Sequence, residues 1–112
     1  MTRKNISIPN VAEPTDPRAG SQCIRKGELL FVSGQIAFDN GELIGPEDPL
    51  EQCRQCLRHI ESYVVAAGGT LDDVVSLDIF LTDIEFRPAA GQARSEFFNE
   101  PGPSATVVGG VD

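Results

Sequence analysis

The chain has 112 residues, 40% of them hydrophobic, which predicts one soluble domain with a single hydrophobic core. Its net charge of −8 and its scattered lysines and arginines argue against a nucleic-acid partner, because phosphate backbones need a basic surface. No run suits a membrane span or a secretory leader, and three cysteines cannot all pair within one chain, so we expect no membrane partner and a reducing, cytoplasmic location.

The N-terminal part contains β-branched and aromatic runs separated by turn residues, which predicts strands joined by tight turns. The expected strands are residues 6–8, a strand beginning at 23–25, residues 29–38, and a hairpin partner at 42–44. The run at 29–38 partly alternates, and Gly34 in its middle indicates a bulge or a close backbone approach.

A long amphipathic helix is expected after Asp48, a typical N-cap residue, with Pro49 at the first helical position. Apolar residues recur at spacings of three and four, which predicts one buried stripe. The stripe consists of Leu50, Cys53, Leu57, Ile60, Val64 and Ala67. Gly68 and Gly69 are expected to end the helix with a left-handed residue.

The second half adds a strand from Val74, a helix over residues 86–98 and a strand over 105–108. In the first of these strands, one face is expected under the helix and the other is more polar. The helix-side face holds Val75, Leu77, Ile79 and Leu81, and the other holds Val74, Ser76, Asp78 and Phe80. This order of elements predicts an α+β domain, a mixed sheet with two helices packed on one face. The uncovered face then needs a partner, which favours an oligomer.

Two groups of residues are candidates for chemistry. The spacing of Cys53, Cys56 and His59 resembles that of metal ligands, but the three lie inside a predicted helix without a second pair of ligands. We therefore expect no metal site, buried cysteines and His59 on the surface. The phrase Ser33-Gly34-Gln35 at a strand end fits a pocket wall, and it equally fits a strand that turns a corner.

Several phrases in order resemble the RidA/YjgF family over residues 20–108. They are Gly27-Glu28-Leu29-Leu30-Phe31-Val32-Ser33-Gly34-Gln35-Ile36, Ala66-Ala67-Gly68-Gly69-Thr70-Leu71-Asp72-Asp73-Val74-Val75, Phe80-Leu81-Thr82-Asp83 and Glu96-Phe97-Phe98. The resemblance implies a chorismate-mutase-like fold and a homotrimer with small-molecule sites between subunits. It also implies hydrolysis of reactive enamines and imines without a cofactor.

Position by position, the resemblance implies a changed site. Ala105 stands where active members carry the arginine that binds a substrate carboxylate, and Gly91 lies near the place of an asparagine. Arg94 replaces an aromatic residue, so it is either a replacement cation or a solvated helix residue. The candidate substrate-binding residues are Ser33, Gly34, Gln35, Gly91, Arg94, Ala105 and Thr106.

The family's last strand, which supplies a glutamate in active members, is expected after residue 112. Residues 1–112 would then form a single domain that either continues beyond Asp112 or ends with an exposed sheet edge.

Three functions remain open on the sequence. The first is an enamine or imine deaminase with an altered substrate, and the alternative is a non-catalytic trimeric module that binds a small metabolite. The third is a ribonuclease or translation inhibitor, an older interpretation of the family. The acidic charge argues against that third function, since single-stranded RNA binding needs basic and aromatic surface.

Overall fold

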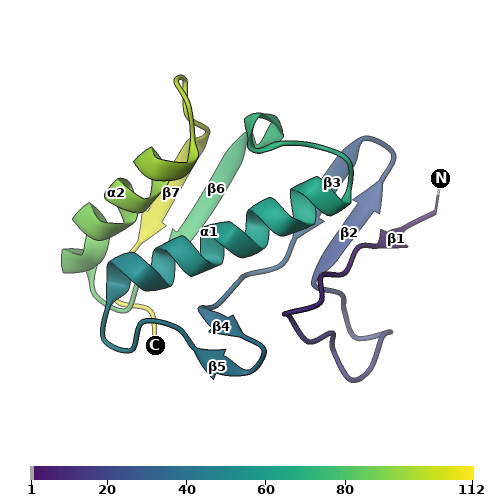
Figure 1. Ribbon diagram of the computed structural model, residues 1–112, viewed down its shortest axis with the longest axis horizontal. Coiled ribbons are helices and arrows are strands. Elements are labelled where there is room, and N and C mark those ends of the chain that lie inside the picture. Colours follow the sequence, from purple (N-terminus) through teal and green to yellow (C-terminus); the bar gives the residue numbers. More distant parts are fainter. Residues whose placement is uncertain (1) are drawn as a thin grey trace.

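Helices α1 (Pro49–Ala66) and α2 (Arg87–Phe97) lie on one side of a layer of strands (Figure 1). The computed structural model describes residues 2–112. Its strands are β1 (Lys4–Asn5), β2 (Cys23–Lys26), β3 (Leu29–Val32), β4 (Phe38–Asp39), β5 (Glu42–Leu43), β6 (Ser76–Phe80) and β7 (Ser104–Val108). Short 3-10 turns occupy Leu71–Asp73 and Ile84–Phe86. The α+β prediction is therefore confirmed.

The strand layer consists of three hydrogen-bonded groups. Strands β1, β2 and β3 pair in that order, each antiparallel to the next, and β6 pairs with β7 in parallel. Strands β4 and β5 form a small hairpin at the edge of the domain (Figure 1). Strands β3 and β6 lie on either side of α1 and do not pair with each other. Both antiparallel and parallel pairs occur, as expected for a mixed arrangement.

The ends of α1 follow from its sequence. The Asp48 carboxylate accepts a hydrogen bond from the Glu51 backbone N–H at 3.1 Å, and Pro49 occupies the first turn, where its missing N–H costs nothing. After the helix, Gly68 adopts φ = +95°, a conformation that side chains with a Cβ rarely take. The predicted cap, first residue and terminator are all confirmed.

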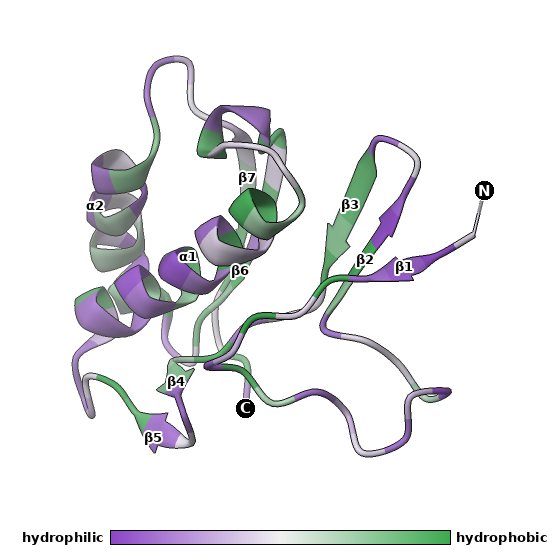
Figure 2. Ribbon diagram, turned by 45° about the vertical axis from the view of Figure 1, so that its right-hand side comes forward, coloured by the Kyte–Doolittle hydropathy of each residue, from purple (hydrophilic) through white to green (hydrophobic). Residues whose placement is uncertain are grey.

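Helix α1 contributes to two separate hydrophobic clusters, one on each half of the strand layer. Its Tyr63 packs with Cys23 of β2 and with the segment just after β1 (Ile6, Ile8). Its Leu57 packs with Leu77 of β6 and Ala93 of α2, and the rest of the predicted stripe surrounds these two clusters. Figure 2 shows hydrophilic and hydrophobic residues changing places along α1, whereas β3 is hydrophobic. Burial of this stripe is the main term that holds the layers together.

The two helices are also joined by charge. The Arg54 guanidinium donates two hydrogen bonds of 2.7 Å to the Glu96 carboxylate on α2, in the bidentate geometry that arginine favours. Arg54 also contacts Glu51, which accepts a 2.9 Å bond from Arg58. The hydrogen bonds from Arg54 to Glu96, and then the charge of Arg54, hold the pKa of the Glu96 carboxyl below its usual value. The pairs fix the orientation of α2 on α1.

Two strand predictions are wrong in their boundaries. The expected strand over 29–38 ends at Val32, since the last inter-strand bond there runs from the Ser33 N–H to the Gln22 carbonyl. The expected strand at residues 6–8 is instead β1 at Lys4–Asn5. Ile6 and Ile8 remain buried, so the apolar pattern marked core residues that lie beyond the paired ladder.

Two side-chain predictions are also wrong. Val74 packs against the core and Val75 is 79% exposed, because β6 begins only at Ser76 and the alternation has not started at these residues. His59 is 1% exposed and not on the surface, because its ring lies against Phe38 of β4 and against Asn10. Its Nε2–H donates to the Phe38 carbonyl at 2.7 Å.

The hydroxyl of Tyr63 gives a testable consequence of this packing. The residue is fully buried, and its oxygen has no hydrogen-bond partner within residues 2–112, which raises the Tyr63 pKa to about 12 through desolvation. An unpaired buried hydroxyl is destabilising, so Tyr63→Phe should raise the free energy of unfolding by about 1 kcal/mol in urea titrations. The reference variant Leu57→Ala should lower it by about 2–5 kcal/mol. A clear loss of stability in Tyr63→Phe would mean that the hydroxyl is satisfied.

Candidate functional site

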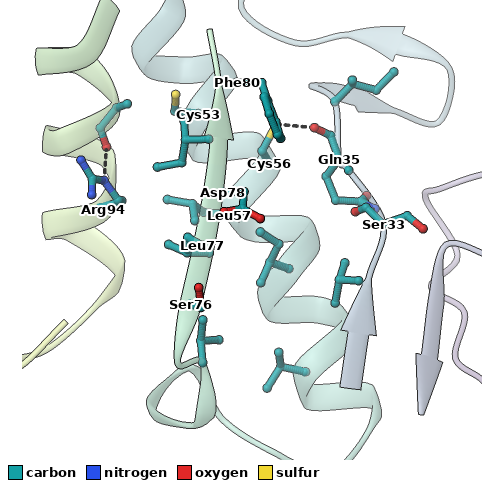
Figure 3. Close-up of a pocket in the computed structure, with 18 of the residues that line it drawn as sticks. Ser33, Gln35, Cys53, Cys56, Leu57, Ser76, Leu77, Asp78, Phe80 and Arg94 are labelled. Carbon is teal, nitrogen blue, oxygen red and sulfur yellow. Dashed lines mark hydrogen bonds between the residues drawn. The ribbon is translucent and has the colours of Figure 1, made fainter. Parts of the chain in front are cut away.

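A cavity of about 1180 Å³ lies between β3 and β6 above α1 (Figure 3). Its apolar lining comes largely from α1 and continues onto the inner faces of the two strands. The helix contributes Cys53, Cys56, Leu57, Ile60 and Val64, and the strands contribute Leu30, Val32, Leu77 and Ile79. Polar groups lie along its margin, which is the usual composition of a small-molecule site.

The segment after β3 forms one end of this cavity and is fixed by a local polar network. The Ser33 hydroxyl donates to the Ser21 carbonyl at 2.7 Å, and the Gln35 amide donates to the Ser33 carbonyl at 3.0 Å and to Gln22 at 3.1 Å. The Cys56 thiol donates to the Gln35 carbonyl at 3.4 Å, which ties the segment to α1 (Figure 3). The side chains therefore serve to hold the backbone in place.

This network leaves the backbone N–H and C=O groups of Gly34 without hydrogen-bond partners. Neither the N–H nor the C=O of Gly34 takes part in a hydrogen bond of the described chain, and the Gln35 N–H is equally free. A Cβ built on Gly34 would meet nothing within 4 Å, and its φ is ordinary. Intramolecular packing thus gives no reason for glycine here. The position suits a ligand that approaches the backbone closely.

The only predicted cation of the site, Arg94, lies on the far side of β6 from Ser33 and Gln35 (Figure 3). Its guanidinium is half-buried between α1 and α2, and its Nε–H donates to the Ala90 carbonyl at 3.3 Å. Gly91 lies beside it, since a Cβ there would be 3.8 Å from Nη2. The structure brings Gly91 and Arg94 together, but not next to the Ser33-Gly34-Gln35 segment.

Ala105 and Thr106 lie on β7, where they pair in register with Leu77 and Asp78. Both are exposed and lie outside the lining of the cavity, as does Gly91. The cavity thus collects four of the seven predicted residues, Ser33, Gly34, Gln35 and Arg94. Ala105, which pairs with Leu77, is separated from the cavity by the width of β6.

Sequence reasoning missed the cavity's apolar floor and its outer margin. Cys56 was expected to be buried, yet it is half-buried and lines the cavity. Asp78 and Phe80 are exposed at the margin on β6. The apolar stripe of α1 was visible in the sequence and is longer than one pair of strands can cover. The stripe alone does not show which of its residues line a cavity.

Among the described residues, the thiols that line the cavity have raised pKa values, and no cluster of metal ligands is found. Burial, with a smaller effect from Cys53, raises the pKa of the Cys56 thiol to about 11, so it is a poor nucleophile near neutral pH. Within residues 2–112, no three histidine, cysteine, aspartate or glutamate side chains are grouped to hold a metal ion. The described helices include none that is long and apolar enough to cross a membrane. The available chemistry is that of backbone groups, amides and hydroxyls.

Comparison with known proteins gives one consistent result. Residues 13–111 match the family model described as Endoribonuclease L-PSP. A RutC family protein of Pyrococcus horikoshii is 34% identical, over 92% of this chain and 81% of its own. A protein of Dermatophagoides farinae named 2-iminobutanoate/2-iminopropanoate deaminase is 30% identical, over 96% and 83%. The crystal structure of RidA from a Psychrobacter species superposes with a TM-score of 0.81 at 29% identity, over 94% and 84%.

The thiol environment predicts slow alkylation. Because the Cys56 pKa is raised from 9.0 to about 11, its thiolate fraction at about pH 8 falls roughly a hundredfold. Iodoacetamide labelling of Cys56, followed by mass spectrometry, should be at least that much slower in the native chain than in the urea-unfolded chain. The rate should rise about tenfold per pH unit between pH 8 and pH 10. Equal native and unfolded rates would contradict a protonated thiol.

Proposed function

The chain belongs to the RidA/YjgF family, with its chorismate-mutase-like α+β fold, and we propose that it hydrolyses a small enamine or imine metabolite. The Ser33-Gly34-Gln35 segment is the proposed contact, at the end of the cavity between β3 and β6. The observation that carries the proposal is the free backbone of Gly34 and Gln35, which is rigidly held and unobstructed. A relative named for 2-iminobutanoate/2-iminopropanoate deamination supports this class of substrate.

The reaction needs little from the protein beyond orientation. Water adds to the C=N bond, with its oxygen bonding to carbon and one proton passing to nitrogen. The second proton then moves from oxygen to nitrogen as the C–N bond breaks, which leaves a carbonyl compound and ammonia. Free N–H groups at Gly34 and Gln35 would orient the substrate, and the Gly34 carbonyl would accept a hydrogen bond from the attacking water and so hold it in position.

The charge distribution supports a substrate that differs from a simple amino-acid imine. Ala105 has no charge, and Arg94 lies across β6 from the Ser33-Gly34-Gln35 segment. A carboxylate held only by neutral donors in this cavity would lose the charge-assisted bonds that arginine gives, about 1.5–3 kcal/mol each. We therefore propose an imine or enamine that is neutral, or whose carboxylate reaches Arg94.

A non-catalytic role is the second candidate, favoured by one specific observation. No histidine lines the described part of the cavity, its thiols have raised pKa values, and its carboxylates, Glu28, Asp73 and Asp78, are all exposed, so none of these groups is held in a buried position that would tune it for proton transfer. The chain would then bind a small metabolite at the Ser33-Gly34-Gln35 segment without turning it over.

Assembly completes the proposal. The strand face turned away from the helices carries large exposed apolar side chains, more than soluble monomers usually leave bare. They include Leu29 and Phe31 within β3, Ile36 after it, Val75 just before β6 and Phe80 at the end of β6. We propose a homotrimer in which this face is buried between subunits, with the Ser33-Gly34-Gln35 segment and Thr106 near the boundary.

The catalytic proposal is tested by ammonia release from freshly generated 2-aminoacrylate and from a neutral cyclic imine. We expect turnover above buffer with at least one of them, and at least tenfold loss in Gly34→Ala because its methyl group would occupy the space used by the substrate. The matched control is Gly102→Ala, another unobstructed glycine with ordinary φ, which lies outside the cavity. Ligand-induced thermal stabilisation without turnover would favour the binding module. Equal loss in both variants would remove Gly34 from the site.

The assembly proposal is tested by light scattering at micromolar concentration. We expect a trimer mass for the natural chain and a monomer mass for Phe80→Asp, because Phe80 is 64% exposed in one subunit and a carboxylate at this position would be buried unpaired in the assembly. Glu85→Gln, an exposed change in the turn before α2, is the control and should remain trimeric. A monomeric natural chain would remove the interface altogether.

A further inference from the structure

The turn between β4 and β5 consists of an asparagine followed directly by a glycine, Asn40-Gly41. Asp39 pairs with Glu42 across it, and φ is +52° at Asn40 and +82° at Gly41. Positive φ at both central residues is typical of the type I′ hairpin turn, for which Asn-Gly is a preferred sequence. The hairpin lies at the edge of the domain (Figure 1), and Asn40 is exposed to solvent there.

The two groups of this turn that can react with each other have no partner among residues 2–112. The Gly41 N–H donates to no acceptor there, and the Asn40 side-chain amide makes no hydrogen bond. The backbone N–H of Asn40 is the group that is used, since it donates to the Asn10 carbonyl at 3.0 Å. A Cβ built on Gly41 would meet nothing within 4 Å. The Gly41 nitrogen is therefore free to approach the neighbouring side-chain amide.

The following residue distinguishes Asn40 from the other asparagines of the chain. Asn5 and Asn10 precede β-branched residues, which restrict the backbone beside them, and Asn99 precedes a glutamate. Gly41 has no side chain, so the peptide bond between Asn40 and Gly41 has the greatest conformational freedom. Asparagine is one of the chemically labile residues of proteins. Its lability is expected to be greatest at this turn.

We propose that Asn40-Gly41 is a site of spontaneous deamidation, whose isoaspartate product uncovers the buried His59. The Gly41 nitrogen loses its proton and bonds to the side-chain carbonyl carbon of Asn40. The C–N bond of the side-chain amide then breaks, and the amide nitrogen leaves with that proton as ammonia. Water opens the resulting cyclic imide: cleavage at the backbone carbonyl gives isoaspartate, and cleavage at the side-chain carbonyl gives aspartate. The reaction needs no oxidant, and it releases one ammonia per chain without a substrate, so it is separate from the proposed hydrolysis.

Isoaspartate changes the hairpin because the main chain then runs through the Cβ of residue 40, which adds one atom to the turn. A two-residue loop fixes the register of its strands, so this added atom breaks the pairing of β4 with β5. The Phe38 carbonyl in β4 accepts the 2.7 Å bond from the His59 Nε2–H. Asn10 joins the same two parts, since its carbonyl accepts the Asn40 N–H and its amide donates to His59 Nδ1 at 3.4 Å. Loss of the turn therefore removes both contacts that cover the imidazole.

The chemistry is tested by incubating the natural chain and mapping its peptides by mass spectrometry. Asn40 should show the mass change of an amide converted to a carboxyl group, and isoaspartyl methyltransferase should methylate the peptide that contains it. Asn5, Asn10 and Asn99 serve as internal controls and should stay unmodified. The rate should be higher in mildly alkaline than in mildly acidic buffer, because the attacking nitrogen must lose its proton. The native chain should react at most about tenfold more slowly than the urea-unfolded chain. Reaction in the unfolded chain alone would overturn the proposal.

The structural consequence is read at His59, the only histidine of the chain. Diethyl pyrocarbonate should label His59 slowly in the fresh chain, where the residue is 1% exposed, and at least tenfold faster in the fraction that carries isoaspartate. Freshly purified Asn40→Asp should keep His59 protected, because Asp-Gly also suits the turn. This variant separates the added backbone atom from the added charge. Isoaspartate with unchanged labelling of His59 would overturn the proposal, as would fast labelling of fresh Asn40→Asp.

Two glycine substitutions provide matched variants. Asn40→Gly removes the side-chain amide and leaves Gly-Gly, which type I′ turns accept, so incubation should produce neither isoaspartate nor faster labelling of His59. Asn99→Gly changes another exposed asparagine outside the hairpin and should age like the natural chain. Far-ultraviolet circular dichroism checks the folding of both. If Asn40→Gly does not fold, the peptide maps and His59 labelling of the natural chain decide the question. An equal rise of His59 labelling in both aged variants would overturn the proposal.

Discussion

The structure depends on helix α1 being buried along one continuous stripe. Strands β3 and β6 exchange no hydrogen bond in the described chain, so the two halves of the strand layer are joined mainly through this helix. Tyr63 anchors one end in the cluster around Cys23, and Leu57 anchors the middle in the cluster around Leu77. Because apolar burial has no direction, one helix can hold two separate sheets without fixing the backbone between them.

That arrangement creates the cavity and gives it an unusual character. Between the two clusters, Cys56 and Ile60 of α1 are half-buried and line the cavity. The walls on either side are strand edges with free backbone groups, and the floor is apolar.

The candidate chemistry follows from the backbone and not from reactive side chains. Ser33, Gln35 and Cys56 use their polar groups to position the segment around Gly34, whose N–H and C=O stay free. Preorganised backbone groups can stabilise developing charge without any reorganisation at the moment of reaction. A site of this kind selects ligands by shape and by hydrogen-bonding geometry.

The sequence by itself determined the elements whose signals are local: the Asp48 cap, the Gly68 terminator, both helices, the β4–β5 turn and the α+β class. Its ordered phrases also determined the family. Tertiary structure alone decided the end of β3 at Val32, the burial of His59 under the hairpin, and the position of Arg94 across β6 from Gln35. These features depend on which segments distant in sequence pack together, and hydrophobic periodicity carries no information about that choice. The periodicity marks which residues avoid water, whereas the packed fold decides what covers each of them.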